Sequence, residues 1–222
     1  MQRFLLQQNI ARYQRLLREA SDVGLQHTLQ DLLLSAQREL AVLDSASSGV
    51  SLGLTPPSPL RNQPRRAEEI AGHLPADFES SPRPYLILDP GPGLHIIGMN
   101  DAYARSTMID RARAAGLPLF EVFPDNPDDA TADGVNNLYA SLRTAAETGQ
   151  PHAMPIQRYD VRDPSGHFVK RYWQPVNTPV FEPEGRLICL LHHVEDVTRD
   201  VLSSLPGAGQ GDLTSEPRRS NS

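Results

Sequence analysis

The amino-acid sequence predicts an α+β fold, in which a five-stranded antiparallel sheet carries helices on one face and follows an N-terminal helical hairpin. Three turns that contain Pro and Gly separate runs rich in β-branched and aromatic residues, as expected of strands. Residues 100–149 have helical periodicity instead, and residues 1–44 repeat a helical pattern twice. Strands, a helical insertion and further strands in this order are typical of one antiparallel sheet with helices on one side.

Residues 1–44 are predicted to form two amphipathic helices joined by a short turn. Apolar residues recur at spacings of three and four in both helices: Leu6, Ile10, Tyr13 and Leu17 in the first, and Leu25, Leu29, Leu32, Ala36, Leu40 and Leu43 in the second. A segment of this size buries too little apolar surface to be stable alone. The hairpin is therefore expected either to dock on its own downstream domain or to self-associate into a helical bundle.

Two segments are expected to lack regular structure. Residues 45–76 are rich in Ser, Gly and Pro and show no apolar periodicity, which predicts a disordered linker. Residues 202–222 are equally poor in apolar residues and predict a disordered tail. The folded domain is accordingly placed at residues 77–201.

Each predicted hairpin of the sheet contains a turn with a physical reason. The turn at residues 89–93 separates YLIL from LHIIGM, the turn at 163–166 separates IQRYDV from FVKRYW, and the turn at 182–185 separates PVNTPVF from RLICLLHHV. Pro presets φ at the second turn position and Gly accepts a positive φ later in the turn. The flanking runs therefore read as strands.

The helical insertion begins at Asn100, whose side-chain oxygen is placed to cap a helix over residues 101–104. The run LPLFEVFP predicts one short turn. A longer helix is expected between Gly134 and Gly149, because Val135, Leu138, Leu142 and Ala145 fall on one side of it.

Four segments carry a resemblance to a known family. FESSPRPYLILD enters the first strand, and IIGMNDAYAR contains an Asn that follows the second strand and opens a helix. GLPLFEVFP supplies short helical turns, and the last strand closes with VEDVTRD. In combination these segments resemble PAS domains, over roughly residues 78 to 201.

The resemblance implies a dimeric sensory module that detects small molecules, redox state, gas or light on behalf of a histidine kinase or a transcription regulator. Asp196 and Thr198 match the motif at which the chain leaves a PAS domain. In PAS sensors this motif usually leads into a helix that runs on to an output domain, whereas here Leu202 is followed by SSLPGAGQGD. Output is therefore expected to pass through a partner chain or the N-terminal helices.

The sequence identifies no cofactor. Light-sensing relatives that react covalently with flavin need a Cys in the helical region, but Cys189 lies in the last predicted strand and is expected to be a packed structural thiol. Haem-binding relatives place a His on the helices over the pocket, and residues 100–149 contain none. Haem ligation from His95, His192 or His193 on strands stays open, as does flavin bound without covalent chemistry.

No metal site is predicted. His192 and His193 are neighbours in a strand, so their side chains point to opposite faces and cannot share one ion. One imidazole is expected to face the pocket or the helices, and the other to face solvent. The four aspartates between residues 125 and 133 miss the spacing of a calcium loop, and their charge is favourable at the start of the helix near Gly134.

The space between the sheet and the helices is the expected ligand pocket. Its candidate residues are Asn100, Tyr103, Met108, Tyr159, Trp173, Asn177 and His192. Trp173 and Asn177 share one strand face, and Trp173 is expected in the core under the helices, not on the outer face as a dimer contact. An inward-facing His192 is expected to hydrogen-bond a ligand or to sense pH.

Composition narrows the classes of function. The net charge of −6 disfavours binding to nucleic acid. The absence of a long apolar run or a signal-like start predicts a cytoplasmic protein without a membrane partner. No hydrolase motif or phosphate-binding loop appears, so a non-enzymatic sensory module is expected. The alternatives are a ligand-free interaction scaffold and, third, a small enzyme on a cone-shaped α+β fold.

Overall fold

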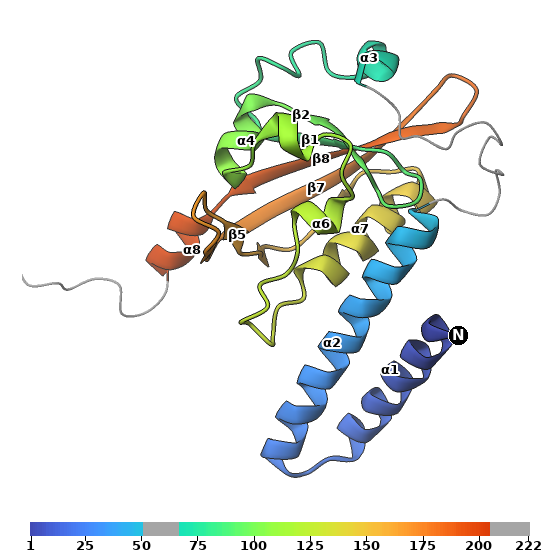
Figure 1. Ribbon diagram of the computed structural model, residues 1–222, viewed down its shortest axis with the longest axis vertical. Coiled ribbons are helices and arrows are strands. Elements are labelled where there is room, and N and C mark those ends of the chain that lie inside the picture. The colour runs from blue at the N-terminus through green and yellow to red at the C-terminus, as the bar shows by residue number, and fades with distance from the viewer. Residues whose placement is uncertain (51–66, 205–222) are drawn as a thin grey trace, which may run out of the picture.

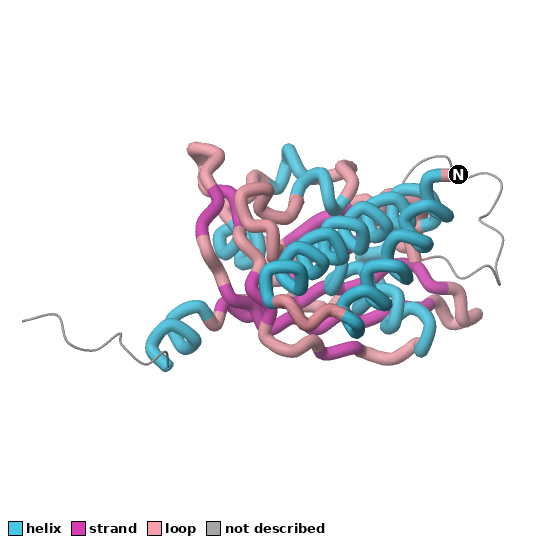
Figure 2. The backbone as a smooth tube through the Cα atoms, turned by 90° about the horizontal axis from the view of Figure 1, so that it is seen from below, coloured by secondary structure: helices cyan, strands magenta, loops and turns pink. Residues whose placement is uncertain are grey.

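The computed structural model describes residues 1–50 and 67–204. Its N-terminal part is a hairpin of α1 (Gln2–Glu19) and α2 (Val23–Ser48), which lie side by side (Figure 1 and Figure 2). The Asp22 carboxylate accepts a hydrogen bond from the Leu25 amide and so caps α2. Leu6 of α1 and Leu29 and Ala36 of α2 are buried, as the apolar spacing requires. The predicted helical hairpin is confirmed.

The C-terminal end of α2 docks on the downstream domain. The Gly93 amide donates to the Ser45 carbonyl oxygen at 2.8 Å. Gly49 ends the helix with a φ of +59°, and a Cβ atom there would lie 2.1 Å from the carbonyl oxygen of Gly91. Only glycine accommodates such an approach of two backbones. Of the two expectations for the hairpin, docking on its own domain is observed, and self-association stays a prediction.

One antiparallel sheet forms the centre of the domain. Its strands are β1 (Tyr85–Leu88), β2 (Ile96–Met99), β3 (His152–Ala153), β4 (Gln157–Arg158), β7 (Tyr172–Phe181) and β8 (Leu187–Asp196). They follow the order β2-β1-β8-β7-β3, and β4 pairs with β7 on the same edge as β3. Because β3 and β4 share one position, the sheet has the five strand positions that the sequence predicts.

Two further strands, β5 (Val161–Arg162) and β6 (Phe168–Val169), pair only with each other in the described part of the chain. They form a small arm around the turn at residues 163–166. The second predicted hairpin is therefore divided: its first part is this arm, and β4 and β7 carry its pairing into the main sheet.

Both faces of the sheet are covered. Because side chains alternate between the two faces, neighbouring residues of one strand belong to different apolar clusters. Leu86, Leu88 and Leu190 belong to the main core. Ile87 and Leu191 belong to a second apolar cluster on the opposite face. That cluster includes Ile70 and Phe78, contributed by α3 (Ala67–Ile70) and by the segment that follows η1 (Ala71–His73). Helices cover one face as predicted, and this preceding segment packs on the other.

The helices over the main core are α4 (Asp101–Thr107), α5 (Arg111–Ala114), α6 (Leu119–Val122) and α7 (Gly134–Thr148). α7 contacts β3, β7 and β8 and also α2. Its Leu142 and Ala145 are fully buried, and its Tyr139 hydroxyl donates to the Gly49 carbonyl oxygen at 2.9 Å. α7 therefore connects the sheet to the N-terminal hairpin.

The predicted linker at residues 45–76 differs from the structure at both ends. α2 continues to Ser48, and residues 67–73 are helical with Ile70 fully buried. Residues 51–66 and 205–222 lie outside the described residues, so the remaining linker and tail expectations stay predictions. No helix within residues 1–50 and 67–204 is both long enough and apolar enough to span a membrane.

Candidate functional site

A cavity of about 50 Å³ lies between the inner face of the sheet and the helices α4, α6 and α7. It is lined by Tyr103, Thr107, Leu119, Phe123, Gly134, Leu138, Met154, Gln157, Tyr159, Val161, Trp173, Pro175, His192 and Val194. Four of the predicted pocket residues, Tyr103, Tyr159, Trp173 and His192, therefore meet at one place, although they come from three separate regions of the sequence. The cavity wall is mostly apolar, with a few polar groups.

His192 and Thr107 are the most buried polar residues of this wall, each with 3% of its surface exposed. Nδ1 of His192 lies 2.7 Å from Oδ1 of Asn177, whose Nδ2 donates to the Ser141 hydroxyl at 2.7 Å. Nδ2 also approaches the sulfur of Met154 at 3.7 Å. Because a thioether only accepts hydrogen bonds, this contact fixes the amide orientation, and Oδ1 accepts the proton carried by His192 Nδ1.

This chain of hydrogen bonds continues to the edge of the sheet. The Ser141 hydroxyl lies 2.7 Å from Nδ1 of His152, which is only half-buried on β3. We call His192, Asn177, Ser141 and His152 the imidazole relay. The relay fixes the tautomer of His192, because Oδ1 of Asn177 accepts the proton of its Nδ1. Burial and, to a smaller extent, the charge of His193 lower the pKa of His192 to about 3, so its ring is neutral at physiological pH.

His193 occupies the opposite face of the sheet, which confirms that the two histidines are separated. It was expected in solvent, but its side chain is only 17% exposed. Its Nδ1 lies 2.9 Å from the Pro84 carbonyl oxygen, and its ring packs on Tyr85 with the centroids 5.1 Å apart. Tyr85 covers it because β1 and β8 pair these two residues directly.

Two aromatic residues hold the cavity wall opposite α7. The indole of Trp173 is buried and donates from Nε1 to the Tyr159 carbonyl oxygen at 2.8 Å, which confirms the predicted core position. The Tyr159 hydroxyl donates a short hydrogen bond to the Phe123 carbonyl oxygen. Burial, followed by the negative charge of Asp125, raises the pKa of Tyr159 well above its usual value. Tyr159 is therefore a neutral hydrogen-bond donor.

Tyr103 of α4 forms part of the cavity wall. Its ring meets those of Phe123 and His192 edge to face, with both centroid distances at 6.0 Å. Burial raises the pKa of its hydroxyl. Tyr103 and His192 are therefore neutral neighbours in the cavity wall.

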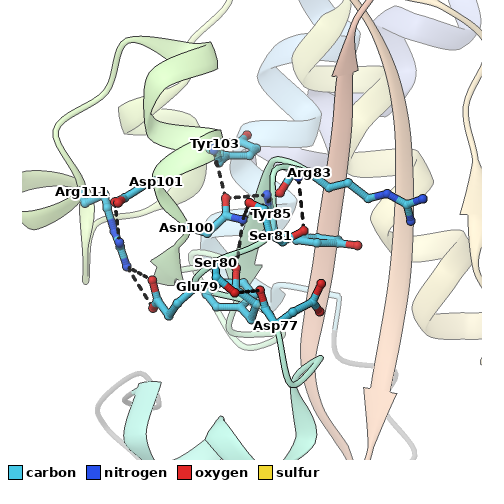
Figure 3. A network of polar contacts seen from close by, with 11 residues as sticks. Asp77, Glu79, Ser80, Ser81, Arg83, Tyr85, Asn100, Asp101, Tyr103 and Arg111 are labelled. Atoms are coloured by element: carbon cyan, nitrogen blue, oxygen red, sulfur yellow. Dashed lines mark hydrogen bonds and ion pairs between the residues drawn. The ribbon is translucent and has the colours of Figure 1, made fainter.

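Asn100, a predicted pocket residue, does not line the cavity and instead joins the two segments beside it (Figure 3). Its Oδ1 accepts from the Tyr103 amide at 2.9 Å, which caps α4 as predicted, and also from the Tyr85 amide at 3.0 Å. Its Nδ2 donates to the carbonyl oxygens of Phe78, Ser81 and Arg83, at 3.0, 3.4 and 2.7 Å. Its side chain is fully buried, so Asn100 is a clamp between the segment 78–85 and α4.

The two other predicted pocket residues also lie outside the lining. Met108 ends α4 in the left-handed conformation, with a φ of +58°, and is half-buried at the edge of the core. Asn177 is fully buried one hydrogen bond behind His192. Its influence on the cavity therefore passes through the imidazole relay.

The predicted exit motif ties the last helix to the sheet. The Asp196 carboxylate accepts from the Thr198 amide at 2.9 Å, and the Thr198 hydroxyl accepts from the Tyr172 amide at 2.9 Å. α8 (Thr198–Ser204) starts from this anchor, so the helix continues three residues beyond the predicted domain end at 201. Val201 and Leu202 of α8 are half-buried and exposed, respectively.

The sequence did not reveal most of the apolar residues that line the cavity, nor Ser141 and His152 of the imidazole relay. Ser141 could have been found, because it lies three residues after Leu138 and four before Ala145 on the buried side of α7. Met154 and His152 had no such signal, since β3 is only two residues long and its register follows from β7.

A second, polar cavity of about 170 Å³ adjoins the loop before α7. Three of the four aspartates that line it are engaged: Asp125 accepts from the Val135 amide at 3.0 Å and from Arg38 Nε at 2.9 Å, and Asp160 and Asp129 pair with Arg158. Burial nevertheless raises the pKa of Asp125 above its usual value. The Asp125 bond to Val135 confirms that negative charge supports the start of α7.

Cys189 is fully buried on the outer face of the sheet with Ile188 and Leu191, away from the cavity. It is the packed thiol that the sequence predicts. Among the described residues, no group of three or more His, Cys, Asp or Glu side chains is arranged to hold a metal ion.

Comparison with known proteins identifies the domain. The family model for the PAS fold matches residues 78–201, which is more than half of the chain. A search of curated proteins found no match. Among solved structures, the PAS domain of a protein from Colwellia psychrerythraea is 14% identical with a TM-score of 0.42, and the match covers 60% of this chain and 97% of that one.

Two light-oxygen-voltage structures are also similar. An RNA-binding light-oxygen-voltage receptor is 18% identical with a TM-score of 0.44, and the match covers 70% of this chain but only 38% of the receptor. A light-oxygen-voltage domain studied with a flavin analogue is 15% identical with a TM-score of 0.41, covering 55% of this chain and 82% of that domain. PAS domains are generally sensory, non-catalytic modules that commonly mediate protein interactions and dimerisation. With the family model matching residues 78–201 and the sheet and helices arranged as described, this chain belongs to the PAS fold family.

Proposed function

We propose that this protein is a sensory PAS module that binds a small ligand in the cavity beside His192 and relays its presence through α7 to the N-terminal hairpin. The hairpin then changes its contacts with a second copy of the chain or with a partner such as a histidine kinase or a transcription regulator. The net charge of −6 supports a protein partner over a nucleic acid.

The observation that carries the proposal is the position of α7. Gly134 and Leu138, at its start, line the cavity, and its Tyr139 bonds to the residue at the end of α2. A ligand that pushes on the cavity wall therefore displaces the helix on which the hairpin rests.

A second connection runs through the loop before α7. Tyr159 lines the cavity and bonds to the Phe123 carbonyl oxygen, two residues before Asp125. Asp125 in turn holds both the Val135 amide and Arg38 of α2. Movement of Tyr159 thus reaches the ion pair that fastens the hairpin. A ligand shifts this equilibrium only if it binds the docked and undocked states with different affinities.

The proposal is tested by screening small molecules against the full chain by thermal shift, with native mass spectrometry for stoichiometry. A compound that binds the folded state raises the melting temperature. We expect such a compound to change hydrogen exchange in α2 and to lose its effect in Leu138→Phe, which fills the cavity. Compounds that bind in the cavity and leave exchange in α2 unchanged contradict the proposed transmission from the cavity to the hairpin.

Native mass spectrometry of the same samples also tests the homodimer that we propose. A dimer is expected to be the main species at micromolar concentration. A monomer at all concentrations, with and without bound compound, refutes self-association and leaves a partner protein as the recipient of the signal.

A ligand-free interaction scaffold is the second candidate, and the size of the cavity favours it. Sites for small molecules usually have about 300–1,000 Å³, whereas this cavity has about 50 Å³. A melting temperature that no compound in the library changes, combined with constitutive binding to a partner, supports the scaffold over the sensor.

A further inference from the structure

The cavity wall defines the charge of any molecule that enters it. The described residues that line the cavity include no Asp, Glu, Lys or Arg. A charged ligand would leave water without an opposite charge to receive it, which is strongly unfavourable. The wall therefore excludes ions of either sign.

The imidazole relay defines the hydrogen bond that the wall offers. Nδ1 of His192 carries the proton that it donates to Asn177, because the Asn177 amide is turned towards Ser141 and Met154. Nε2 of the neutral ring therefore keeps a free lone pair. Within the described residues Nε2 has no hydrogen-bond partner, while the ring itself lines the cavity.

We propose that the cavity selects a small, neutral, largely apolar molecule with one hydrogen-bond donor, such as a short alcohol, which donates to Nε2 of His192. The inference rests on the proposed function, because it assumes that the cavity is a ligand site. Asn177 acts as a positioning residue, since it fixes the tautomer of His192 without touching the ligand.

The volume sets the size of the molecule. A water molecule needs about 10–15 Å³ and the six heavy atoms of benzene fit a cavity of about 150 Å³, so a cavity of about 50 Å³ corresponds to roughly two to five heavy atoms. Larger ligands require the wall to move.

Two isomers with five heavy atoms test the donor requirement directly. 1-Butanol and diethyl ether have the same formula, but only the alcohol donates a hydrogen bond. Trp173 reports occupancy by its fluorescence, because it lines the cavity and is the only Trp of the chain. Saturation-transfer NMR of each compound gives an independent reading.

We expect the full chain to bind 1-butanol about fivefold more tightly than diethyl ether, as one hydrogen bond predicts, and to bind butyrate and butylammonium more weakly than either. His192→Leu is expected to remove the preference for the alcohol. His193→Leu, the neighbouring residue on the opposite face, is expected to keep it.

The outcomes separate the two proposals. Equal binding of the isomers to the wild-type chain, or tighter binding of a charged analogue, overturns the inference and leaves the cavity as a ligand site. Absence of binding by all four compounds overturns the inference, and the library screen then decides the proposed function on its own. The comparison of isomers uses the wild-type chain and so does not depend on folding of the variants.

Discussion

Replacing Asn100 with alanine is expected to lower the free energy of unfolding by about 3–5 kcal/mol. The side chain is within hydrogen-bonding distance of five backbone groups, with the two hydrogens of Nδ2 shared among three carbonyl oxygens, and it is fully buried. A hydrogen bond contributes about 1 kcal/mol net, and a buried group left without a partner costs about 1–3 kcal/mol. The expected loss is near the lower end of the sum of these contributions, because water can enter beside the shortened side chain and bind the freed backbone groups. Such a loss is a large share of the roughly 5–15 kcal/mol that holds a domain together.

The assay is urea unfolding followed by Trp173 fluorescence, with linear extrapolation to water. Asn100→Asp separates the two sides of the clamp, because it keeps the two acceptor bonds and turns an oxygen towards three carbonyl groups. It is expected to be at least as unstable as Asn100→Ala. The matched control is Asp110→Ala, which removes the exposed cap of α5 and an exposed ion pair with Arg113 and should cost about 1 kcal/mol. A loss of stability in Asn100→Ala no larger than in this control would contradict the role of Asn100 as a clamp.

Three further predictions follow from the same packing. Gly134→Ala is expected to cost about 1–3 kcal/mol in urea unfolding, because its Cβ would lie 2.2 Å from the Tyr159 ring; Gly98→Ala, with open space around it, should stay within about 1 kcal/mol of wild type. Arg38→Ala is expected to cost about 2 kcal/mol and to raise hydrogen exchange in α2 more than in β8, because it leaves the Asp125 carboxylate buried without its cation. Lowering the pH from 6.5 towards 3 is expected to destabilise the fold by up to about 1.4 kcal/mol per unit, because unfolded His192 binds a proton that the folded chain, with its pKa of about 3, does not.

Each of these three has a result that contradicts it. Equal stability of the two glycine variants refutes the contact between Gly134 and Tyr159. Unchanged exchange in α2 of Arg38→Ala refutes the role of the ion pair in docking. For the pH prediction, unfolding of His192→Gln is measured across the same range: a slope as steep as in wild type assigns the effect to other groups.

The strands were predictable because their turns are local. The turns at residues 89–93 and 182–185 contain Pro and Gly at the positions that a turn requires, and both connect strands that pair in the sheet. The third, at 163–166, was placed correctly but closes the arm of β5 and β6. The strands beside this turn differ from the predicted hairpin because pairing with β7 depends on tertiary register, which no local signal specifies.

The pocket was only partly predictable for a related reason. Strand parity placed Trp173 on the inner face of the sheet, and helix periodicity would have placed Ser141 on the buried side of α7. Asn100 caps α4 as predicted, but it does not line the cavity, because its Nδ2 is taken by carbonyl groups of residues 78–83. Those partners lie in a stretch whose path depends on how it packs over the sheet. The helical turns at residues 67–73 were missed because the composition around them favours a linker.

The most direct test of coupling between the cavity and the hairpin is hydrogen exchange, measured by mass spectrometry, in Leu138→Phe and in wild type. Leu138 lines the cavity from α7, so a larger ring there imitates a bound molecule. Ile188→Phe, an overpacking change at another buried residue, in the cluster on the outer face, is the control. Coupling between the cavity and the hairpin predicts that Leu138→Phe raises exchange in residues 23–48 more than in β8, and that Ile188→Phe does not. Equal exchange of residues 23–48 in Leu138→Phe and wild type, with Trp173 emission changed, would contradict it.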